Sequence, residues 1–218
     1  MGYFRELPNL QYQSPYSNRI SSASYVTAKN IFRRMKIRDD LKNVFSVFNK
    51  YEIDDGDRPD TVARDLYGKS NLDWVVLITA NIINVRDEWP LSSKELYDFT
   101  VSKYGLTEIN KVRHYETTEV KNKNKVIILP KGKIVDKEFK IPTPDSANNS
   151  ESELNPVRGV TYYEYESTEN EKKRTIDVLR SEYLQQFLND IRNEMIYKKS
   201  SQFVNDKLIK TENTRITN

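Results

Sequence analysis

The apolar and polar positions of the chain divide its first half into short elements with clear ends. Over residues 45–53, apolar side chains fall mostly on alternate positions, which favours a strand. Residues 59–67 carry a one-sided apolar stripe with Pro59 in the first turn and Gly68 after the last, which predicts a helix. Residues 71–81 are apolar around most of their circumference, which predicts a second, more buried helix. The residues expected in the core of this region are Leu66, Tyr67, Trp74, Leu77 and Ile78.

Two further signals follow this predicted helix pair. Pro90 biases Trp89 towards an extended conformation, so we expect a short returning strand that includes these residues. Ser92 and Glu95 have the spacing of a capping box, which predicts a third helix that ends at Gly105. The region therefore reads as a strand, two helices, a returning strand and an extra helix.

The second half of the chain changes between strand and helix patterns. Residues 114–120 and 125–130 are rich in residues that favour strands, and they flank a polar turn, which predicts a β-hairpin. Residues 160–166 alternate between two faces and favour another strand. From Ser181 onward, apolar residues recur at the spacing of one helix face, which predicts an amphipathic helix. The residues on that face are Leu184, Phe187, Leu188, Ile191 and Met195.

These elements predict an α+β chain with five consecutive parts. Residues 28–42 fit either a short helix or an irregular amphipathic strand. Proline, serine and asparagine gather at 142–158, which is typical of a flexible linker. The parts are an extended N-terminal arm with a short helix (1–42), a helix-pair module with its following helix (43–105), a β-rich region that ends in the linker (106–158), a C-terminal strand and amphipathic helix (159–200), and a polar tail (201–218).

The composition indicates a partial core with much exposed chain. Hydrophobic residues make up 37% of the sequence and charged residues 31%, so relatively little apolar surface is available for burial. The chain contains 14 Tyr, a residue that suits surfaces buried against a partner because it joins apolar area to a polar tip. The 35 Lys and Arg nearly balance the 32 Asp and Glu, which gives little support for a nucleic-acid-binding surface. The basic runs 33–38 and 172–174 are better explained as charged faces that match an acidic partner.

No group of residues in the sequence predicts catalysis or metal binding. The chain has no Cys, which excludes disulfides, thiolate metal sites and cysteine nucleophiles. Its one histidine, His114, has no serine or acidic partner at a motif spacing, so we expect a structural role. The carboxylates between Asp54 and Asp60 lack the spacing of a calcium loop and fit a turn and a helix cap instead. We therefore expect no enzymatic activity, no metal and no cofactor.

The sequence also gives no sign of membrane insertion or export. No stretch approaches the ~18 apolar residues that a membrane span requires. The first residues lack the apolar run of a signal peptide. We therefore expect a soluble protein that does not leave the cell by the classical route.

Several short motifs mark the ends of the predicted helix pair. Gly56 and Asp57 form the turn after the first strand, Tyr67 and Gly68 end the first helix, and Asn81 ends the second. These positions resemble a LysM module, a small β-α-α-β fold. The resemblance implies that the strand and the helix pair form one compact LysM-like unit.

A wider set of motifs extends over nearly the whole chain. Together they resemble the baseplate wedge protein family (gene fifty-three product) of T-even-type contractile-tailed bacteriophages. The resemblance is strongest over 50–104 and weak over 106–158. The motifs include Phe4, Pro8 and Tyr12 near the start, Arg58-Pro59, Trp89-Pro90-Leu91-Ser92, Tyr163-Glu164-Tyr165-Glu166 and Lys173-Arg174-Thr175-Ile176.

The resemblance implies a structural subunit of a contractile tail baseplate that joins neighbouring wedges by protein–protein contacts. The implied partners are other baseplate wedge proteins, the sheath-initiating protein and neighbouring copies around a six-fold ring, without nucleic acid or membrane. The implied location is the tail baseplate of the virion, after assembly in the host cytoplasm. The expected partner-binding residues are Phe4, Pro8, Tyr12, Asp57, Arg58, Asn81, Trp89, Phe187 and Ile191.

Two other functions remain as alternatives. A LysM-like module is also compatible with a peptidoglycan-binding protein or an accessory of a cell-wall hydrolase. That function predicts export or a catalytic domain with paired carboxylates, and the sequence shows neither. The second alternative is a nucleic-acid-binding protein, which the balanced charge does not favour.

Overall fold

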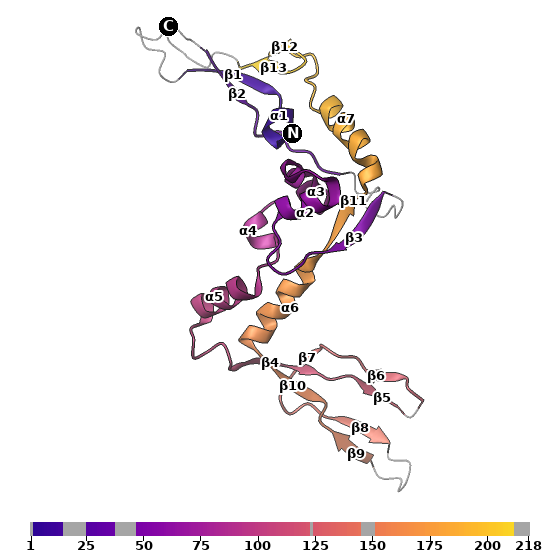
Figure 1. The fold of residues 1–218 in the computed structure, drawn as a ribbon. Helices are drawn as coiled ribbons and strands as arrows, with labels where there is room; N and C mark the ends of the chain where they lie inside the picture. Colours follow the sequence, from indigo (N-terminus) through magenta and orange to yellow (C-terminus); the bar gives the residue numbers. More distant parts are fainter. Residues whose placement is uncertain (1, 15–24, 38–46, 123, 145–150, 212–218) are drawn as a thin grey trace. The chain divides into compact units, whose positions relative to one another are not determined.

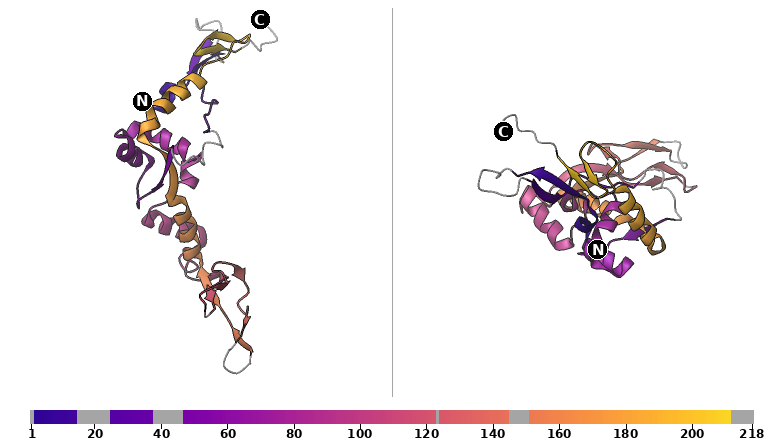
Figure 2. Two further views of the ribbon diagram at one scale, coloured as in Figure 1. Left: turned by 90° about the vertical axis from the view of Figure 1, so that its right-hand side faces the viewer. Right: turned by 90° about the horizontal axis from the view of Figure 1, so that it is seen from above.

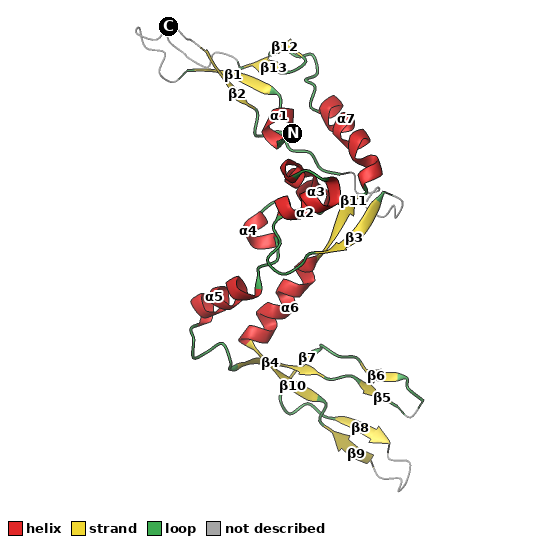
Figure 3. Ribbon diagram, viewed as in Figure 1, coloured by secondary structure: helices red, strands yellow, loops and turns green. Residues whose placement is uncertain are grey.

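The chain forms two compact units, and their secondary structure is mixed α+β as predicted (Figures 1 and 3). Unit 1 consists of Met1–Trp89 and Thr175–Asn218, and unit 2 of Pro90–Arg174. Unit 2 is therefore an insertion in the sequence of unit 1. The computed structural model describes residues 2–14, 25–37, 47–122, 124–144 and 151–211.

The helix pair of unit 1 forms where the apolar pattern predicts it. Helix α2 (Pro59–Tyr67) ends at Gly68, whose φ of 71° is the left-handed conformation of a helix C-cap. Helix α3 (Asp73–Thr79) buries Trp74, Val75 and Val76, as expected for a helix that is apolar on most sides. The remaining helical segments of unit 1 are α1 (Tyr3–Glu6), η1 (Ser70–Leu72), α4 (Val85–Glu88), η2 (Ser181–Tyr183) and α7 (Leu184–Glu194), which is the predicted C-terminal amphipathic helix.

A two-stranded antiparallel sheet joins distant parts of unit 1. Strand β3 (Phe48–Glu52) pairs with β11 (Thr175–Leu179) along its whole length, and the two lie side by side in Figures 1 and 2. The returning strand predicted around Trp89 is wrong. That tryptophan follows α4 and is buried, and its indole N–H donates to the carbonyl of Asp57 at 2.8 Å. The strand that pairs with β3 comes instead from beyond unit 2 in the sequence.

The hydrophobic core of unit 1 gathers around Trp74, which is 5% exposed. Its ring lies 5.7 Å from that of Tyr3 and 6.4 Å from that of Phe187. The hydroxyl of Tyr67 donates to the carbonyl of Leu179 at 2.9 Å, and burial raises the pKa of this tyrosine. Leu66, Tyr67, Leu77 and Ile78 pack against this core as partly buried residues.

The two ends of the chain meet in a four-stranded sheet of order β12-β13-β1-β2 (Figure 1). Strand β1 (Asn9–Gln13) pairs antiparallel with β2 (Tyr25–Lys29) and parallel with β13 (Leu208–Lys210). Strand β12 (Phe203–Asn205) pairs with β13. The N-terminal arm and the described part of the polar tail therefore each contain two paired strands, and the pairing of β1 with β13 joins the two ends.

The short helix considered for residues 28–42 is not found in the described part of that range. Residues 28–29 end strand β2, a turn follows, and 33–37 form neither helix nor strand. Residues 38–42 lie outside the described residues. Two apolar residues of this range pack against other elements: Ile37 is buried, and Met35 packs against the core.

Unit 2 combines two helices with short paired strands. Helix α5 (Ser93–Tyr104) begins at the predicted capping box and ends before Gly105. The Ser92 hydroxyl accepts from the Glu95 N–H at 3.3 Å, and the Glu95 carboxylate accepts from the Ser92 N–H at 3.1 Å. The strands are β4 (Val112–Thr117), β5 (Val120–Lys121), β6 (Ile127–Leu129), β7 (Ile134–Val135), β8 (Ile141–Pro144), β9 (Glu151–Leu154) and β10 (Val157–Thr161).

The strand predicted over 160–166 is wrong, because a helix begins inside that range. Strand β10 ends at Thr161, and α6 (Tyr162–Arg174) follows directly. The Thr161 hydroxyl accepts from the Glu164 N–H, and the Glu164 carboxylate accepts from the Thr161 N–H, each at 3.1 Å. This reciprocal cap favours a helix start, and it outweighs the alternating tyrosines that favour a strand.

Strand pairing in unit 2 follows the prediction only in part. Strands β5 and β6 form the part of the predicted hairpin that is next to its turn, with Val120 opposite Leu129. Strand β4 pairs instead with β10 and β7. In the range of the predicted linker, β8 pairs with β9, and residues 145–150 lie outside the described residues. These pairings depend on partners distant in sequence, so local composition does not reveal them.

Helices α5 and α6 are held together by an ion pair and by aromatic contacts. Lys103 Nζ and the Tyr104 hydroxyl both donate to Glu166 Oε1, at 2.8 and 2.7 Å. The rings of Tyr104 and Tyr162 lie 4.6 Å apart. Partial burial alone raises the pKa of Glu166, but the hydrogen bonds from Lys103 and Tyr104 outweigh burial and bring the pKa below its ordinary value.

We expect unit 2 to lose stability in acid partly through Glu166. Because the folded-state pKa is the lower one, the stabilisation is complete above the ordinary value of 4.5 and is lost as the pH falls through the folded-state value. Glu166→Gln should remove this pH dependence and lower the free energy of unfolding at neutral pH by roughly 1 kcal/mol. Thermal melts followed by far-UV circular dichroism at neutral and acidic pH measure both effects. The exposed carboxylate variant Glu171→Gln is the control, and equal acid sensitivity of Glu166→Gln and the wild type would contradict the prediction.

Candidate functional site

A turn after strand β2 is fastened to the C-terminal end of helix α7 in unit 1. The Asn30 side-chain amide donates to the Tyr197 hydroxyl at 2.9 Å. The Arg33 guanidinium donates to the carbonyls of Glu194 and Met195 at 3.3 and 3.1 Å, where the helix dipole is negative. The same guanidinium lies 5.1 Å from the centre of the Tyr197 ring. Both ends of the turn are therefore anchored.

This anchored turn exposes two large apolar side chains, Ile31 at 62% and Phe32 at 87%. The Phe32 N–H donates to the Asn30 side-chain oxygen at 3.2 Å, which fixes the backbone of the turn. An exposed aromatic ring on an ordered turn can bind a partner with little further loss of backbone entropy. Exposed apolar surface of this kind marks interaction sites. We call Ile31 and Phe32 the turn patch.

A second group of exposed apolar residues lies on the β5–β6 hairpin of unit 2. Val126, Ile127 and Ile128 are 59%, 51% and 52% exposed. The hairpin turn is held by the Asn122 side-chain oxygen, which accepts from the N–H groups of Asn124 and Val126, both at 2.9 Å. We call Val126, Ile127 and Ile128 the hairpin patch.

A cavity of about 670 Å³ in unit 1 brings two predicted contact residues together with a predicted core residue. Phe187 and Ile191 of α7 line it, as does Ile78 of α3. Ile191 is 2% exposed and belongs to the core, while Phe187 is partly buried and packs against Trp74. In this chain, both α7 residues therefore contribute to packing within unit 1.

The structure divides the other predicted contact residues between interior and surface. Trp89 and Pro8 are buried, and Asp57 is partly buried, with its carbonyl bound by the Trp89 indole. Neither the turn patch nor the hairpin patch was predicted from the sequence. The pattern that could have identified them is adjacent apolar residues beside a turn. The predicted contact residues on the surface are Phe4, Tyr12, Arg58 and Asn81.

The described residues contain no cluster of His, Cys, Asp or Glu suited to holding a metal ion. His114 is packed as a structural residue, with Nε2 2.8 Å from Glu116 Oε1 and its ring edge-on to Tyr165 at 5.9 Å. Within the same described ranges, no helix is both long and apolar enough to cross a membrane. The features that stand out are therefore surfaces suited to protein contacts.

The sequence model of a phage protein family described as Base plate wedge protein 53 matches residues 7–193. The chain belongs to this family. Membership makes it a structural protein of the phage tail baseplate, and it confirms the family that the motifs predicted. The match includes all of unit 2 and the helix pair of unit 1, and it ends before strands β12 and β13. A search of curated proteins found no match.

Proposed function

We propose that this wedge protein joins neighbouring wedges of a contractile-tail baseplate through protein–protein contacts. The observation that carries the proposal is that each unit, taken by itself, has an exposed apolar patch on ordered backbone. A joining subunit needs separate surfaces for separate neighbours, and the turn patch and the hairpin patch meet that need. Their partners would be other wedge proteins, the sheath-initiating protein and neighbouring copies in a six-fold ring, assembled in the host cytoplasm.

The packing around the turn patch supports a role in binding. The Phe32 side chain is 87% exposed and adds little to the core, yet three hydrogen bonds donated by Asn30 and Arg33 hold its turn in place. Burial of such a ring against a partner contributes binding free energy in proportion to the apolar area removed from water. The hairpin patch has the same combination of a fixed turn and exposed apolar side chains.

A LysM-like arrangement of unit 1 belongs to the same proposal. The order β3, α2, α3 and β11, with the two strands antiparallel, supports a β-α-α-β module in which unit 2 is inserted before the last strand. We assign this module a scaffolding role and no catalytic activity. The turn patch then belongs to the same unit as this module, held between β2 and the end of α7, and the inserted unit carries the hairpin patch.

Reconstitution of wedges from purified proteins of the same phage tests the joining role. We expect Phe32→Ser and Ile127→Ser each to weaken the association of wedges at least about tenfold, because buried apolar anchors dominate interface energies. Sedimentation velocity and negative-stain images of the assembled rings measure the loss. Thermal melts verify that each variant remains folded.

Matched controls replace exposed apolar residues outside both patches. Ile83→Ser in unit 1 and Leu106→Ser in unit 2 remove side chains that are 66% and 63% exposed, and both variants should assemble normally. Normal assembly of the patch variants would overturn the proposal. Saturable binding of the chain to purified peptidoglycan in a pull-down would favour the glycan-binding alternative instead.

A further inference from the structure

A cavity of about 360 Å³ in unit 1 has more positive than negative charge in its lining. Its walls come from the end of α1 and the residues after it, the end of β2, the end of α7 and the β12–β13 turn. Four cationic side chains line it, together with one carboxylate, that of Glu6. The cations are Arg5, Lys29, Arg192 and Lys207.

Only one of these cations is neutralised by an ion pair. Arg192 Nε donates to Glu6 Oε2 at 2.9 Å, and this carboxylate is 7% exposed. Lys29 Nζ donates to the Leu7 carbonyl at 2.8 Å, which leaves its charge uncompensated. In the described part of the chain, Arg5 and Lys207 have no ion pair. The cavity therefore has three uncompensated positive charges, which favour binding of an anionic group.

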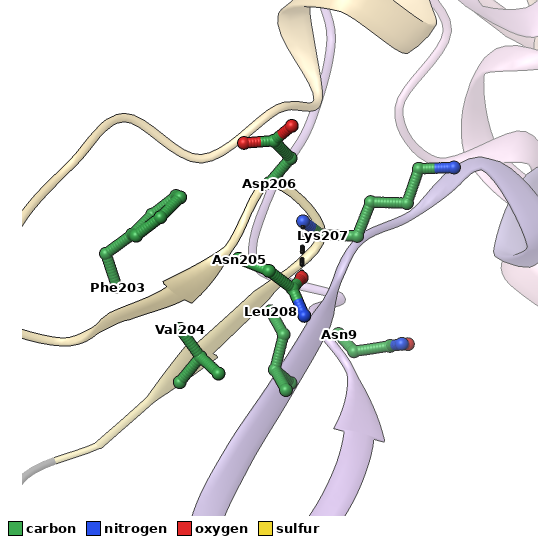
Figure 4. Close-up of a pocket in the computed structure, with 7 residues that line it drawn as sticks. All are labelled: Asn9, Phe203, Val204, Asn205, Asp206, Lys207 and Leu208. Atoms are coloured by element: carbon green, nitrogen blue, oxygen red, sulfur yellow. Dashed lines mark hydrogen bonds between the residues drawn. The ribbon is translucent and has the colours of Figure 1, made fainter.

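A second, more open hollow adjoins this cavity and shares Asn9 and Lys207 with it (Figure 4). Its apolar lining consists of Phe203, Val204 and Leu208. Because Asn9 and Lys207 line both hollows, one extended ligand can reach from the cavity to this apolar surface. The pair of hollows therefore fits a ligand that has an apolar group beside its negative charge.

The backbone that carries Lys207 is fixed from two sides. Its N–H donates to the Asn205 side-chain oxygen at 3.0 Å, the dashed line in Figure 4. Its carbonyl accepts from the N–H of Asn9 at 2.7 Å. The carboxylate of Asp206 points away from the Lys207 side chain (Figure 4). The lysine is thus placed between the two hollows, and its neighbouring acid does not neutralise it.

From this geometry we infer that the two hollows bind an acidic peptide segment of a partner protein, with a carboxylate in the cavity and an adjacent apolar side chain on Phe203, Val204 and Leu208. A free inorganic anion would use the cavity alone, whereas a peptide uses both hollows. The site shares no residue with the turn patch or the hairpin patch. Its test is therefore independent of wedge joining.

The test is a titration of the ¹⁵N-labelled full chain, observed by NMR, with a short peptide that is acetylated and amidated and contains adjacent Glu and Phe. We expect shifts at the amides of residues 5–7, 9 and 203–208, and weaker binding as salt is added. The matching peptide with Gln in place of Glu should bind at least about tenfold more weakly, since a charge-assisted hydrogen bond is lost. Inorganic phosphate serves as the third probe.

Two variants complete the test. Arg5→Glu combined with Lys207→Glu should abolish peptide binding, and both side chains are exposed, so the fold should be retained. Lys198→Glu combined with Lys199→Glu makes the same change of charge outside the cavity and should leave binding intact. The inference is overturned if the Gln peptide binds equally well, if both double variants behave alike, or if phosphate binds as tightly as the acidic peptide.

Discussion

Replacement of Trp74 by alanine is expected to lower the free energy of unfolding of unit 1 by about 3–5 kcal/mol, because it removes a buried ring and leaves a cavity. The ring is 5% exposed and contacts Tyr3 of α1 and Phe187 of α7. It therefore joins three elements that are distant in sequence. Few single substitutions in a core have a larger effect.

Tryptophan fluorescence during urea unfolding can measure this loss, because both Trp74 and Trp89 belong to unit 1. In the Trp74→Ala variant, the buried Trp89 remains as the reporter. Ile83→Ala is the control, since its side chain is 66% exposed, and we expect a change of less than about 0.5 kcal/mol. A loss below about 1 kcal/mol for Trp74→Ala would show that the ring does not join these elements as described.

The second large effect is expected in unit 2, from Asn170→Ala. The Asn170 side chain is buried at 3% exposure and makes a matched pair of hydrogen bonds with the backbone of Leu91. It accepts from the Leu91 N–H at 2.8 Å and donates to the Leu91 carbonyl at 2.9 Å. Alanine would leave both backbone groups without a partner, at a cost of about 2–4 kcal/mol.

Hydrogen exchange separates this effect from changes in unit 1. Amides of α5 and α6 should exchange faster in Asn170→Ala, while the unfolding transition reported by tryptophan fluorescence should stay unchanged. Asn110→Ala, which alters an exposed asparagine of the same unit, is the control. Unaltered protection of α5 and α6 would contradict the assigned role of Asn170.

The elements that could be predicted from the sequence are those that depend on neighbouring residues. The capping box of Ser92 and Glu95 acts within one helical turn, and so does the left-handed Gly68 that ends α2. The same local signal was present at Thr161 and Glu164. At that position the alternating tyrosines predicted a strand, but the reciprocal cap starts helix α6 instead.

Strand pairing could not be predicted in the same way. Strand β3 has a sequence typical of a strand, but nothing near it identifies β11 as its partner. The β12–β13 hairpin pairs with β1 near the other end of the chain. Such pairings depend on the arrangement of the whole unit, so a local pattern predicts the strand and leaves its partner open.

The sequence also could not separate buried from exposed residues among the predicted contact residues, because burial depends on tertiary packing. Trp89 follows helix α4 and Ile191 lies on the apolar face of α7, and at both positions the sequence permits either a core or a contact role. Tertiary packing buries both of them. Phe32, in contrast, is left exposed because Arg33 and Asn30 bind the end of α7 and hold the turn at the surface.

The insertion of unit 2 between β3 and β11 also sets an order of folding during synthesis. All residues of unit 2 are contiguous, so this unit can fold once Arg174 has left the ribosome. Strand β3 and its helix pair must wait for β11, and β1 must wait longer still for β13 near the end of the chain. Closing such long loops is slow. In the nascent chain β1 can already pair with β2, but its other edge has no partner until β13 is made, and β3 has none until β11 is made. The sheets of unit 1 are therefore completed only near the end of synthesis.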